Sequence, residues 1–186
     1  VLRWKYDMGI INPAKSKTPS LKELEFQTHE LNRHIADNVL TLLKNDEELL
    51  PLQISDSTKL SIVYLEDFNY HTFDTTINSF HKATSYSINS KTTPEQTDSI
   101  LTSLTNSDII ITLVSGGVNQ TKKNNYGISQ NTLDAIAKIQ DLDKKNILVL
   151  FANPYALASL DTLCEYNSLI MAYQNTVNLQ RSVAQA

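Results

Sequence analysis

The chain has 186 residues, of which 41% are hydrophobic and 19% are charged, and its formal net charge is −4. A chain of this length is expected to form one domain that buries about 70% of the surface exposed by its unfolded form. Acidic and basic residues are interleaved, so the basic stripe with which proteins neutralise phosphates is missing. The longest apolar runs have about eight residues, far short of the roughly 20 needed to cross a bilayer. Neither nucleic acid nor a membrane is therefore expected as a partner.

The first 19 residues differ in character from the rest. Apolar residues from Trp4 to Ile11 precede a stretch rich in Pro, Ser and Lys, which indicates the end of one element followed by a linker. Ser20 and Glu23 then form a capping box, which predicts that a helix begins there. The predicted helix continues, before NDEELLPL, through five apolar residues at helical spacing: Leu31, Ile35, Val39, Leu42 and Leu43.

After Pro51, short apolar runs alternate with helical segments. Helices are predicted between the runs, with Thr93, Ser129 and Asn153 as N-caps. The runs 108–115 and 146–152 are apolar on both faces, which is typical of central parallel strands. Five strands are expected, at about 60–65, 84–88, 108–115, 146–152 and 169–173.

This alternation predicts an α/β fold: a three-layer sandwich with a mainly parallel sheet of five or six strands and helices on both faces. The expected strand order is the flavodoxin-like 2-1-3-4-5, counted from the strand at 60–65.

In an open α/β sheet, ligands bind beyond the carboxyl ends of the strands. Glycines 116 and 117 are interpreted as the flexible start of the long loop that follows the third strand. The turn at Asn153 is interpreted as mainly structural, with Pro154 at the first helical position. The residues predicted to lie at a substrate rim or a domain interface are Ser115, Gly116, Asn153, Tyr155 and Gln174.

Other kinds of chemistry lack the residues that they need. Glu66 and Asp67 are adjacent on an extended segment and point to opposite sides, so a solvated loop is expected there rather than a paired-carboxylate site. A receiver domain would need Asp and Lys where Ser115 and Gln174 stand, and no GxGxxG motif supports a dinucleotide. Ser115 is not in a GxSxG turn, so an esterase elbow is not supported either.

The histidines and the cysteine do not suggest a metal site or a nucleophile. Cys164 is the single cysteine, which excludes an internal disulfide and favours a buried structural thiol. The sequence therefore predicts no catalytic residue, no metal and no cofactor. Four histidines lack metal-ligand spacing and are expected to be surface or packing residues: His29, His34, His71 and His81.

Several segments, in order along the chain, resemble the carboxy-terminal α/β domain of glycoside hydrolase family 3, the β-glucosidase and β-N-acetylhexosaminidase family. The ends of the last two strands are similar to the hexosaminidase-like branch, which often occurs in bacterial proteins with extra domains. The segment LRWKYDMGI resembles the last helix of the preceding barrel domain. The four segments that carry the resemblance are LNRHIADNVLTLLKNDEELLPL, NNYGISQNTLDAI, NILVLFANPYAL and SLIMAYQNT.

The resemblance implies the domain limits. Residues 1–19 would be the end of the preceding domain and a linker, and residues 20–186 the α/β domain, truncated in its last helix. Because the chain begins at Val1 and ends at Ala186 in a helix-forming run without Gly or Pro, we expect it to be an excised fragment.

The resemblance also implies a function. Family 3 enzymes are retaining hydrolases whose Asp nucleophile lies on the barrel domain. The acid/base residue is a barrel His in one branch and a Glu from a second-domain loop in the other. The candidate loops of this chain, LEDFNYHTF and SGGVNQTKKNNYG, contain Glu66 but no convincing counterpart of that Glu. The chain is thus expected to be an accessory domain beside the catalytic barrel of the same polypeptide, with carbohydrate bound only by the full-length protein. The alternative is a non-catalytic binding or scaffolding module. The parent is expected to be a periplasmic or secreted bacterial protein.

Overall fold

The computed structural model describes residues 1–10, 20–66, 69–116, 122–160 and 166–186. The chain divides into two units, Val1–His34 and Ile35–Ala186. In the first unit, α1 (Leu2–Asp7) has only exposed side chains, and Ser20 Oγ accepts from the Glu23 amide at 3.2 Å at the start of α2 (Leu21–Val39). The predicted start of that helix is confirmed.

The second unit is built on one sheet. Within the described residues, six strands pair in the order β1-β6-β5-β4-β2-β3. Five of them, β2 to β6, are parallel to one another, and their order is the predicted 2-1-3-4-5, so the predicted fold class is confirmed. The strands are β1 (Thr41–Asn45), β2 (Leu60–Leu65), β3 (Ala83–Ile88), β4 (Ile109–Ser115), β5 (Lys145–Phe151) and β6 (Ser168–Met171).

One prediction is wrong at β1, the strand that the sequence did not predict. Leu42 and Leu43 were expected to continue the preceding helix, but α2 ends at Val39 and both residues lie in β1. Their spacing fits a helix, yet β1 pairs antiparallel with β6, with Thr41 opposite Met171. The backbone hydrogen bonds of that pairing, which no local pattern reports, decide the conformation here.

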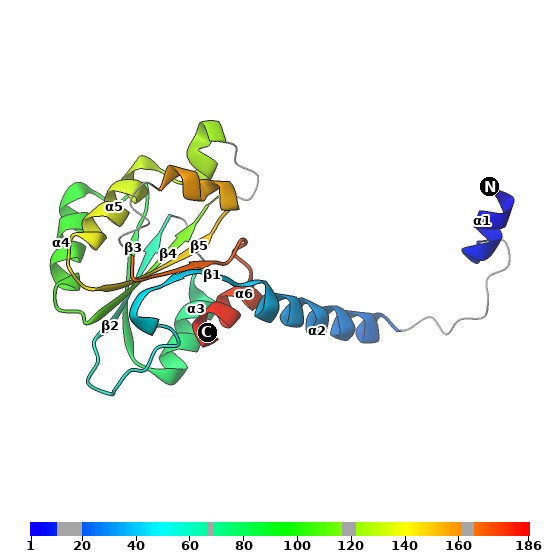
Figure 1. Ribbon diagram of the computed structural model, residues 1–186, viewed down its shortest axis with the longest axis horizontal. Helices are drawn as coiled ribbons and strands as arrows, with labels where there is room; N and C mark the ends of the chain where they lie inside the picture. Colours follow the sequence, from blue (N-terminus) through cyan, green and yellow to red (C-terminus); the bar gives the residue numbers. More distant parts are fainter. Residues whose placement is uncertain (11–19, 67–68, 117–121, 161–165) are drawn as a thin grey trace. The chain divides into compact units, whose positions relative to one another are not determined.

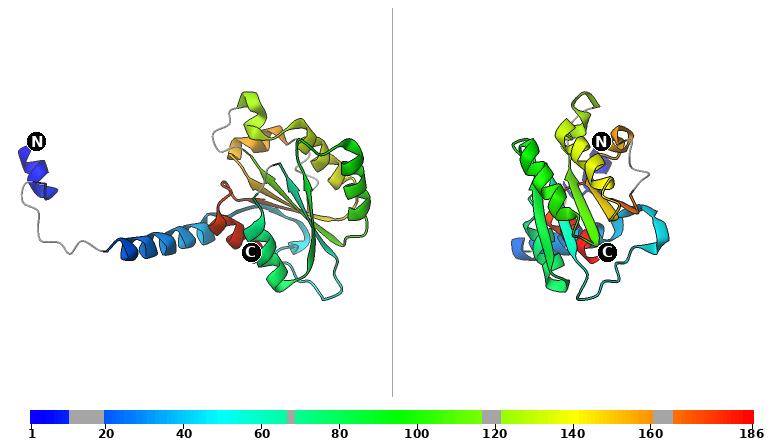
Figure 2. Two further views of the ribbon diagram at one scale, coloured as in Figure 1. Left: turned by 180° about the vertical axis from the view of Figure 1, so that it is seen from behind. Right: turned by 90° about the vertical axis from the view of Figure 1, so that its left-hand side faces the viewer.

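Helices cover both faces of the sheet, as Figures 1 and 2 show. One face carries α4 (Pro94–Leu104) and α5 (Gln130–Gln140); the other carries α3 (His71–Phe80) and α6 (Val177–Gln185). Within β4, Ile110 and Val114 belong to the core under α4 and α5. Its residues Ile109, Ile111 and Leu113 belong to the core under α3 and α6. The central strand is therefore apolar on both sides because both sides are buried.

Side-chain caps begin the helices where the sequence predicts them. Thr93 Oγ1 accepts from the Gln96 amide at 3.3 Å while Gln96 Oε1 accepts from the Thr93 amide at 2.9 Å, which is a complete capping box. Ser129 Oγ accepts from the Thr132 amide at 3.3 Å at the start of α5. Three short 3₁₀ segments complete the described elements: η1 (Asp46–Glu48), η2 (Lys122–Gly127) and η3 (Pro154–Ser159).

Candidate functional site

The predicted rim residues lie along one edge of the sheet. Because β4, β5 and β6 are parallel, with Ser115 opposite Phe151 and Leu150 opposite Met171, their carboxyl ends meet at that edge. Ser115 and Gly116 follow β4, Asn153 and Tyr155 follow β5, and Gln174 follows β6. The topology thus brings the five candidates to the edge where open α/β sheets bind ligands.

Gly116 is held by close packing. Its amide donates to the carbonyl of Phe151 at 3.0 Å. A Cβ at this position would lie 2.8 Å from Ala152 Cβ and 2.9 Å from the carbonyl oxygen of Tyr126. Only glycine therefore allows the ends of β4 and β5 and the η2 segment to approach this closely. The interpretation of Gly116 as part of a flexible loop entrance is therefore wrong, because its backbone is closely packed. Gly117 lies outside the described residues.

The turn after β5 is capped as predicted. Asn153 Oδ1 accepts from the Tyr155 amide at 3.1 Å, and Pro154 occupies the first position of η3. The helix that begins here is a short 3₁₀ helix. Tyr155 is 73% exposed, so its ring contributes little to the core and is presented at the edge.

Gln174 lies in a tight turn after β6. Its amide donates to the carbonyl of Ala172 at 2.6 Å, and its carbonyl accepts from the Thr176 amide at 3.1 Å. Tyr173, just before it, has φ of 60° and its hydroxyl lies 2.8 Å from Thr41 Oγ1. Gln174 itself is exposed, so a constrained turn presents its side chain to solvent.

The prediction that Glu66 lies in a solvated loop is wrong. One carboxylate oxygen, Oε1, accepts from the Ser129 amide and from Thr132 Oγ1, both at 2.6 Å. The residue is half-buried, has φ of 67°, and its own amide donates to the Ile88 carbonyl at 3.0 Å. A carboxylate at the N-terminus of α5 satisfies an unpaired amide and interacts favourably with the helix dipole. Glu66 therefore anchors α5, whereas Asp67 lies outside the described residues.

Gln180 is a residue of this edge that the sequence did not identify. It is buried in α6, and its Nε2 donates to the Asn69 carbonyl and to Asn175 Oδ1, both at 2.6 Å. Its Oε1 accepts from the Phe73 amide at 3.1 Å. One side chain thus joins the segment after β2, the first turn of α3 and the segment after β6. A glutamine at this helix position has no local sequence signature.

A second cluster fixes α3 against the neighbouring strands. The Tyr64 hydroxyl donates to Asp74 Oδ1 at 3.2 Å, and Ser85 Oγ donates to the same oxygen. The ring of Tyr70 stacks on that of Tyr64 with centroids 4.3 Å apart. Burial, and then the nearby Asp74 carboxylate, raise the pKa of Tyr64, so its hydroxyl keeps its proton and acts as the donor. The arrangement is a structural hydrogen-bond network.

The histidines do not gather into a site. His81 is half-buried at the end of α3, with Nε2 lying 2.8 Å from the Thr58 carbonyl. Among the residues that the structure describes, no group of three His, Cys, Asp or Glu could hold a metal ion. Cys164 lies outside them. The other three histidines are exposed: His29, His34 and His71.

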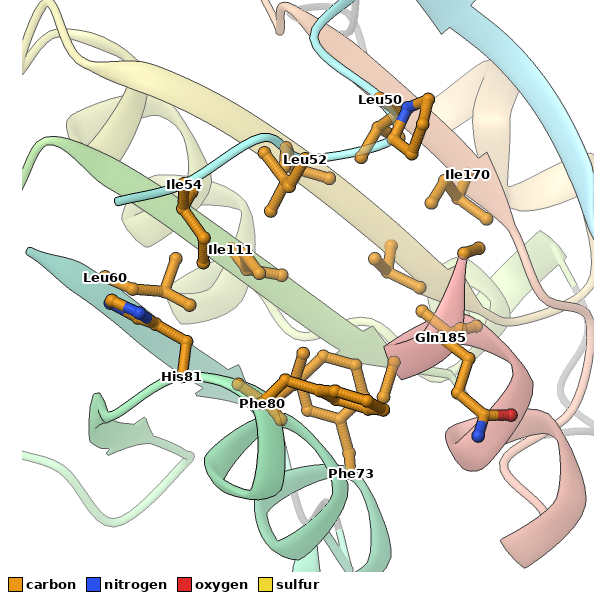
Figure 3. A pocket seen from close by; sticks show the side chains of 17 residues that line it. Leu50, Leu52, Ile54, Leu60, Phe73, Phe80, His81, Ile111, Ile170 and Gln185 are labelled. Carbon is orange, nitrogen blue, oxygen red and sulfur yellow. The ribbon is translucent and has the colours of Figure 1, made fainter. Parts of the chain in front are cut away.

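An apolar cavity of about 290 Å³ lies away from the candidate edge, between the sheet, α3, α6 and the segment 50–54. Figure 3 shows that aliphatic and aromatic side chains line it, with His81 and Gln185 at its margin. None of the five predicted rim residues contributes to it. A cavity of this composition suits an apolar group, and no Asp or Glu side chain is among its lining residues.

The geometry of the edge limits its chemistry. Retaining glycoside hydrolysis uses two carboxyl groups about 5–5.5 Å apart. None of the five candidates is an acid, and the carboxylate of Glu66 already accepts two hydrogen bonds from α5. The described edge can present an aromatic ring and amides to a neighbouring surface or a ligand.

None of the helices in the described part of the chain combines the length and apolar character that a membrane crossing requires.

No protein-family model matches the chain, and no curated protein matches it. Solved structures do. A fungal multi-domain GH3 β-N-acetylglucosaminidase, which has a GCN5-related glucosamine N-acetyltransferase region, superposes with a TM-score of 0.70 and 16% identity over 90% of this chain and 18% of that one. A GH3 β-N-acetylglucosaminidase from Paenibacillus sp. str. FPU-7 superposes with a TM-score of 0.67 and 17% identity, over 98% of this chain and 34% of that one.

The β-glucoside phosphorylase BglX has a TM-score of 0.60 and 16% identity, over 97% of this chain and 33% of that one. The chain therefore spans between 18% and 34% of the length of these three proteins. At these identities the likeness establishes the fold: the chain has the fold of one region of GH3 enzymes. The resemblance found in the sequence is confirmed at that level.

Proposed function

We propose that this chain is the accessory α/β domain of a family 3 glycoside hydrolase, of the retaining β-N-acetylhexosaminidase or β-glucosidase type. The observation that carries the proposal is its fold, which matches one part of two GH3 β-N-acetylglucosaminidases over 90% and 98% of its own length. The sequence segments that resemble the family cover the end of α2 with β1, the start of α5, β5 with the turn after it, and β6 with the turn after it. In this role the domain packs beside a catalytic barrel of the same polypeptide.

The domain does not hydrolyse sugars alone. The nucleophile of such enzymes attacks the anomeric carbon, and a second group protonates the leaving oxygen. Glu66, the acid at the described edge, is held by the Ser129 amide and by Thr132 Oγ1, which suits an anchor for α5. The barrel is therefore proposed to supply the nucleophile in either type, and the acid/base residue as well in the hexosaminidase-like type.

The edge that carries Tyr155 and Gln174 is the proposed face toward the barrel. Both side chains are exposed, and the turns that carry them are held by backbone and cap hydrogen bonds. An amphipathic ring such as that of Tyr155 suits an interface that is apolar on one side and wet on the other.

An activity assay tests the proposal. The purified chain should not release nitrophenol from nitrophenyl β-N-acetylglucosaminide or β-glucoside. A Glu66→Gln variant, which keeps an acceptor oxygen for α5, should behave identically. Turnover that copurifies with the chain and disappears in Glu66→Gln would show that the domain itself is an enzyme.

The alternative is a non-catalytic binding or scaffolding module of a parent that has lost hydrolase activity, and the exposed ring of Tyr155 supports a binding role. Protein-observed NMR titration with N-acetylglucosamine and glucose separates the two. An accessory domain should show no saturable shifts. Saturable shifts at the edge that are lost in Tyr155→Ala would favour the binding module.

A further inference from the structure

The outer edge of β3 presents unpaired backbone groups. In the sheet as the structure describes it, β3 is an end strand whose described neighbour is β2. The Ile88 carbonyl accepts from the Glu66 amide, so Ile88 directs its backbone groups toward β2. Backbone groups alternate in direction along a parallel strand, so Tyr86 and Thr84 also face β2. Ser85 and Ser87 therefore direct their N–H and C=O groups outward.

Side chains satisfy the outward amides at both ends of this edge. The Ala83 amide donates to Asn78 Oδ1 at 3.0 Å, and the Asn89 amide donates to Thr92 Oγ1 at 3.0 Å. Between these two hydrogen bonds, Ser85 and Ser87 are the residues whose backbone N–H and C=O groups point outward and are unpaired. We call these two residues the window.

β3 lacks the features that usually protect an edge strand. Such strands are protected by charged side chains, proline or a bulge. The opposite edge strand, β1, has two of these features, namely Lys44 and an irregularity in the pairing between Leu42 and Lys44. The residues of β3, ATSYSI, include no charge and no proline.

We propose that two copies of this chain pair through β3, antiparallel, about a twofold axis at Tyr86. In this register Ser85 lies opposite Ser87 of the second copy, and Ser87 lies opposite Ser85. Each of the two pairs exchanges both N–H···O bonds, as antiparallel strands do at hydrogen-bonded positions. The two sheets then form one continuous sheet.

The register follows from the window. An axis at Ser85 would place Ser87 opposite Ala83, whose amide is already bound by Asn78. An axis at Tyr86 uses all four outward groups and brings the two Tyr86 side chains together as a cross-strand aromatic pair. A second copy suits this edge because β3 has no charged residue, so two copies of the strand can pair without charge repulsion. Pairing with an unrelated extended peptide would not fix the register by twofold symmetry, so the register distinguishes the two partners.

Sedimentation velocity of the 186-residue chain tests the pairing. An interface of one short strand is small and transient, so the concentration series should reach about 0.5 mM. We expect a dimer whose fraction increases with concentration. Ser87→Pro should abolish it, because proline removes an outward N–H that the dimer needs. The variant should still fold, because an edge strand tolerates proline where the N–H faces solvent. The matched control Ser90→Pro lies in the turn beyond the window and should still dimerise. A chain that stays monomeric throughout, or a folded Ser87→Pro that still dimerises, overturns the proposal.

Cysteine cross-linking tests the register and does not depend on the proline variant folding. In a Cys164→Ser background, Tyr86→Cys should form a disulfide-linked dimer under mild oxidation, because Cβ atoms of directly opposite residues lie about 4.5–5.5 Å apart. Thr84→Cys, which would face Ile88 of the second copy, should not. Equal cross-linking of the two variants, or none in either, excludes the proposed register.

Discussion

Replacing Gln180 with leucine tests how the carboxyl edge of the sheet is held together. Leucine has nearly the same volume but neither accepts nor donates a hydrogen bond. The change removes the acceptor of the Phe73 amide and the donor to Asn69 and Asn175. Tyr70, the N-cap of α3, makes no side-chain cap hydrogen bond, so Gln180 supplies the cap from another helix.

The three lost hydrogen bonds do not cost the same. Asn69 is exposed and Asn175 half-buried, so water can replace those two bonds at roughly 0.5 kcal/mol each. The Phe73 amide is buried, and leaving it without an acceptor costs about 1–3 kcal/mol. The expected loss is about 2–4 kcal/mol of the free energy of unfolding, which is a large part of a typical total of about 5–15 kcal/mol.

Urea denaturation monitored by circular dichroism measures this loss, with Gln130→Leu as the control. Gln130 is exposed in α5, so its replacement should change the free energy of unfolding by less than about 0.5 kcal/mol. In thermal melts, Gln180→Leu should lower Tm by roughly 4–16 °C. A Gln180→Leu variant no less stable than Gln130→Leu would refute the role given to this side chain.

Gln180→Glu separates the acceptor role from the donor role. A carboxylate still accepts from the Phe73 amide but faces the oxygens of Asn69 and Asn175, which raises its pKa in the folded state above the unfolded value of about 4.3. The penalty is then present above the folded pKa and is lost as pH falls through it. The variant should approach wild-type stability near about pH 4. A gap that widens on acidification would contradict this.

Three further pairs of substitutions test the edge. Gly116→Ala forces a methyl group against a backbone oxygen and should cost about 1–3 kcal/mol in urea denaturation, whereas the adjacent Ser115→Ala should cost less than 1 kcal/mol; equal losses would contradict the close packing. Glu66→Ala should cost about 2–3 kcal/mol and Glu66→Gln less, because the amide keeps an acceptor for α5; an alanine variant as stable as the glutamine variant would exclude the anchoring role. Asn153→Ala should lower stability by about 1 kcal/mol through loss of the cap, while the exposed Tyr155→Ala should be neutral in thermal melts; the reverse ranking would show that the turn is not held by its cap.

Local signals were sufficient to predict most of the second unit. The core strands have continuous apolar runs because α4 and α5 bury one face and α3 and α6 the other. The caps at Thr93, Ser129 and Asn153 use residues two or three positions away, so sequence patterns report them directly. Strand order followed because right-handed crossovers leave few topologies for this alternation.

The errors lie where distant segments decide the local structure. Leu42 and Leu43 have helical spacing, but β6, more than 120 residues away, makes them a strand. Glu66 follows a strand as a loop residue would, yet its partners Ser129 and Thr132 are 63 and 66 residues away. Such contacts depend on the assembled sheet, and a single sequence contains no local pattern for them.

The same long-range contacts support the proposal that the carboxyl edge is a domain interface. Glu66 fixes the start of α5, and Gln180 connects the segments after β2 and β6 across more than 100 residues of sequence. Gly116 adds close backbone packing between the ends of β4 and β5. The turns that carry Tyr155 and Gln174 are therefore constrained before any partner arrives. Ordering exposed groups in advance lowers the entropy cost of binding, so an edge built this way can recognise a neighbouring surface without supplying a catalytic group.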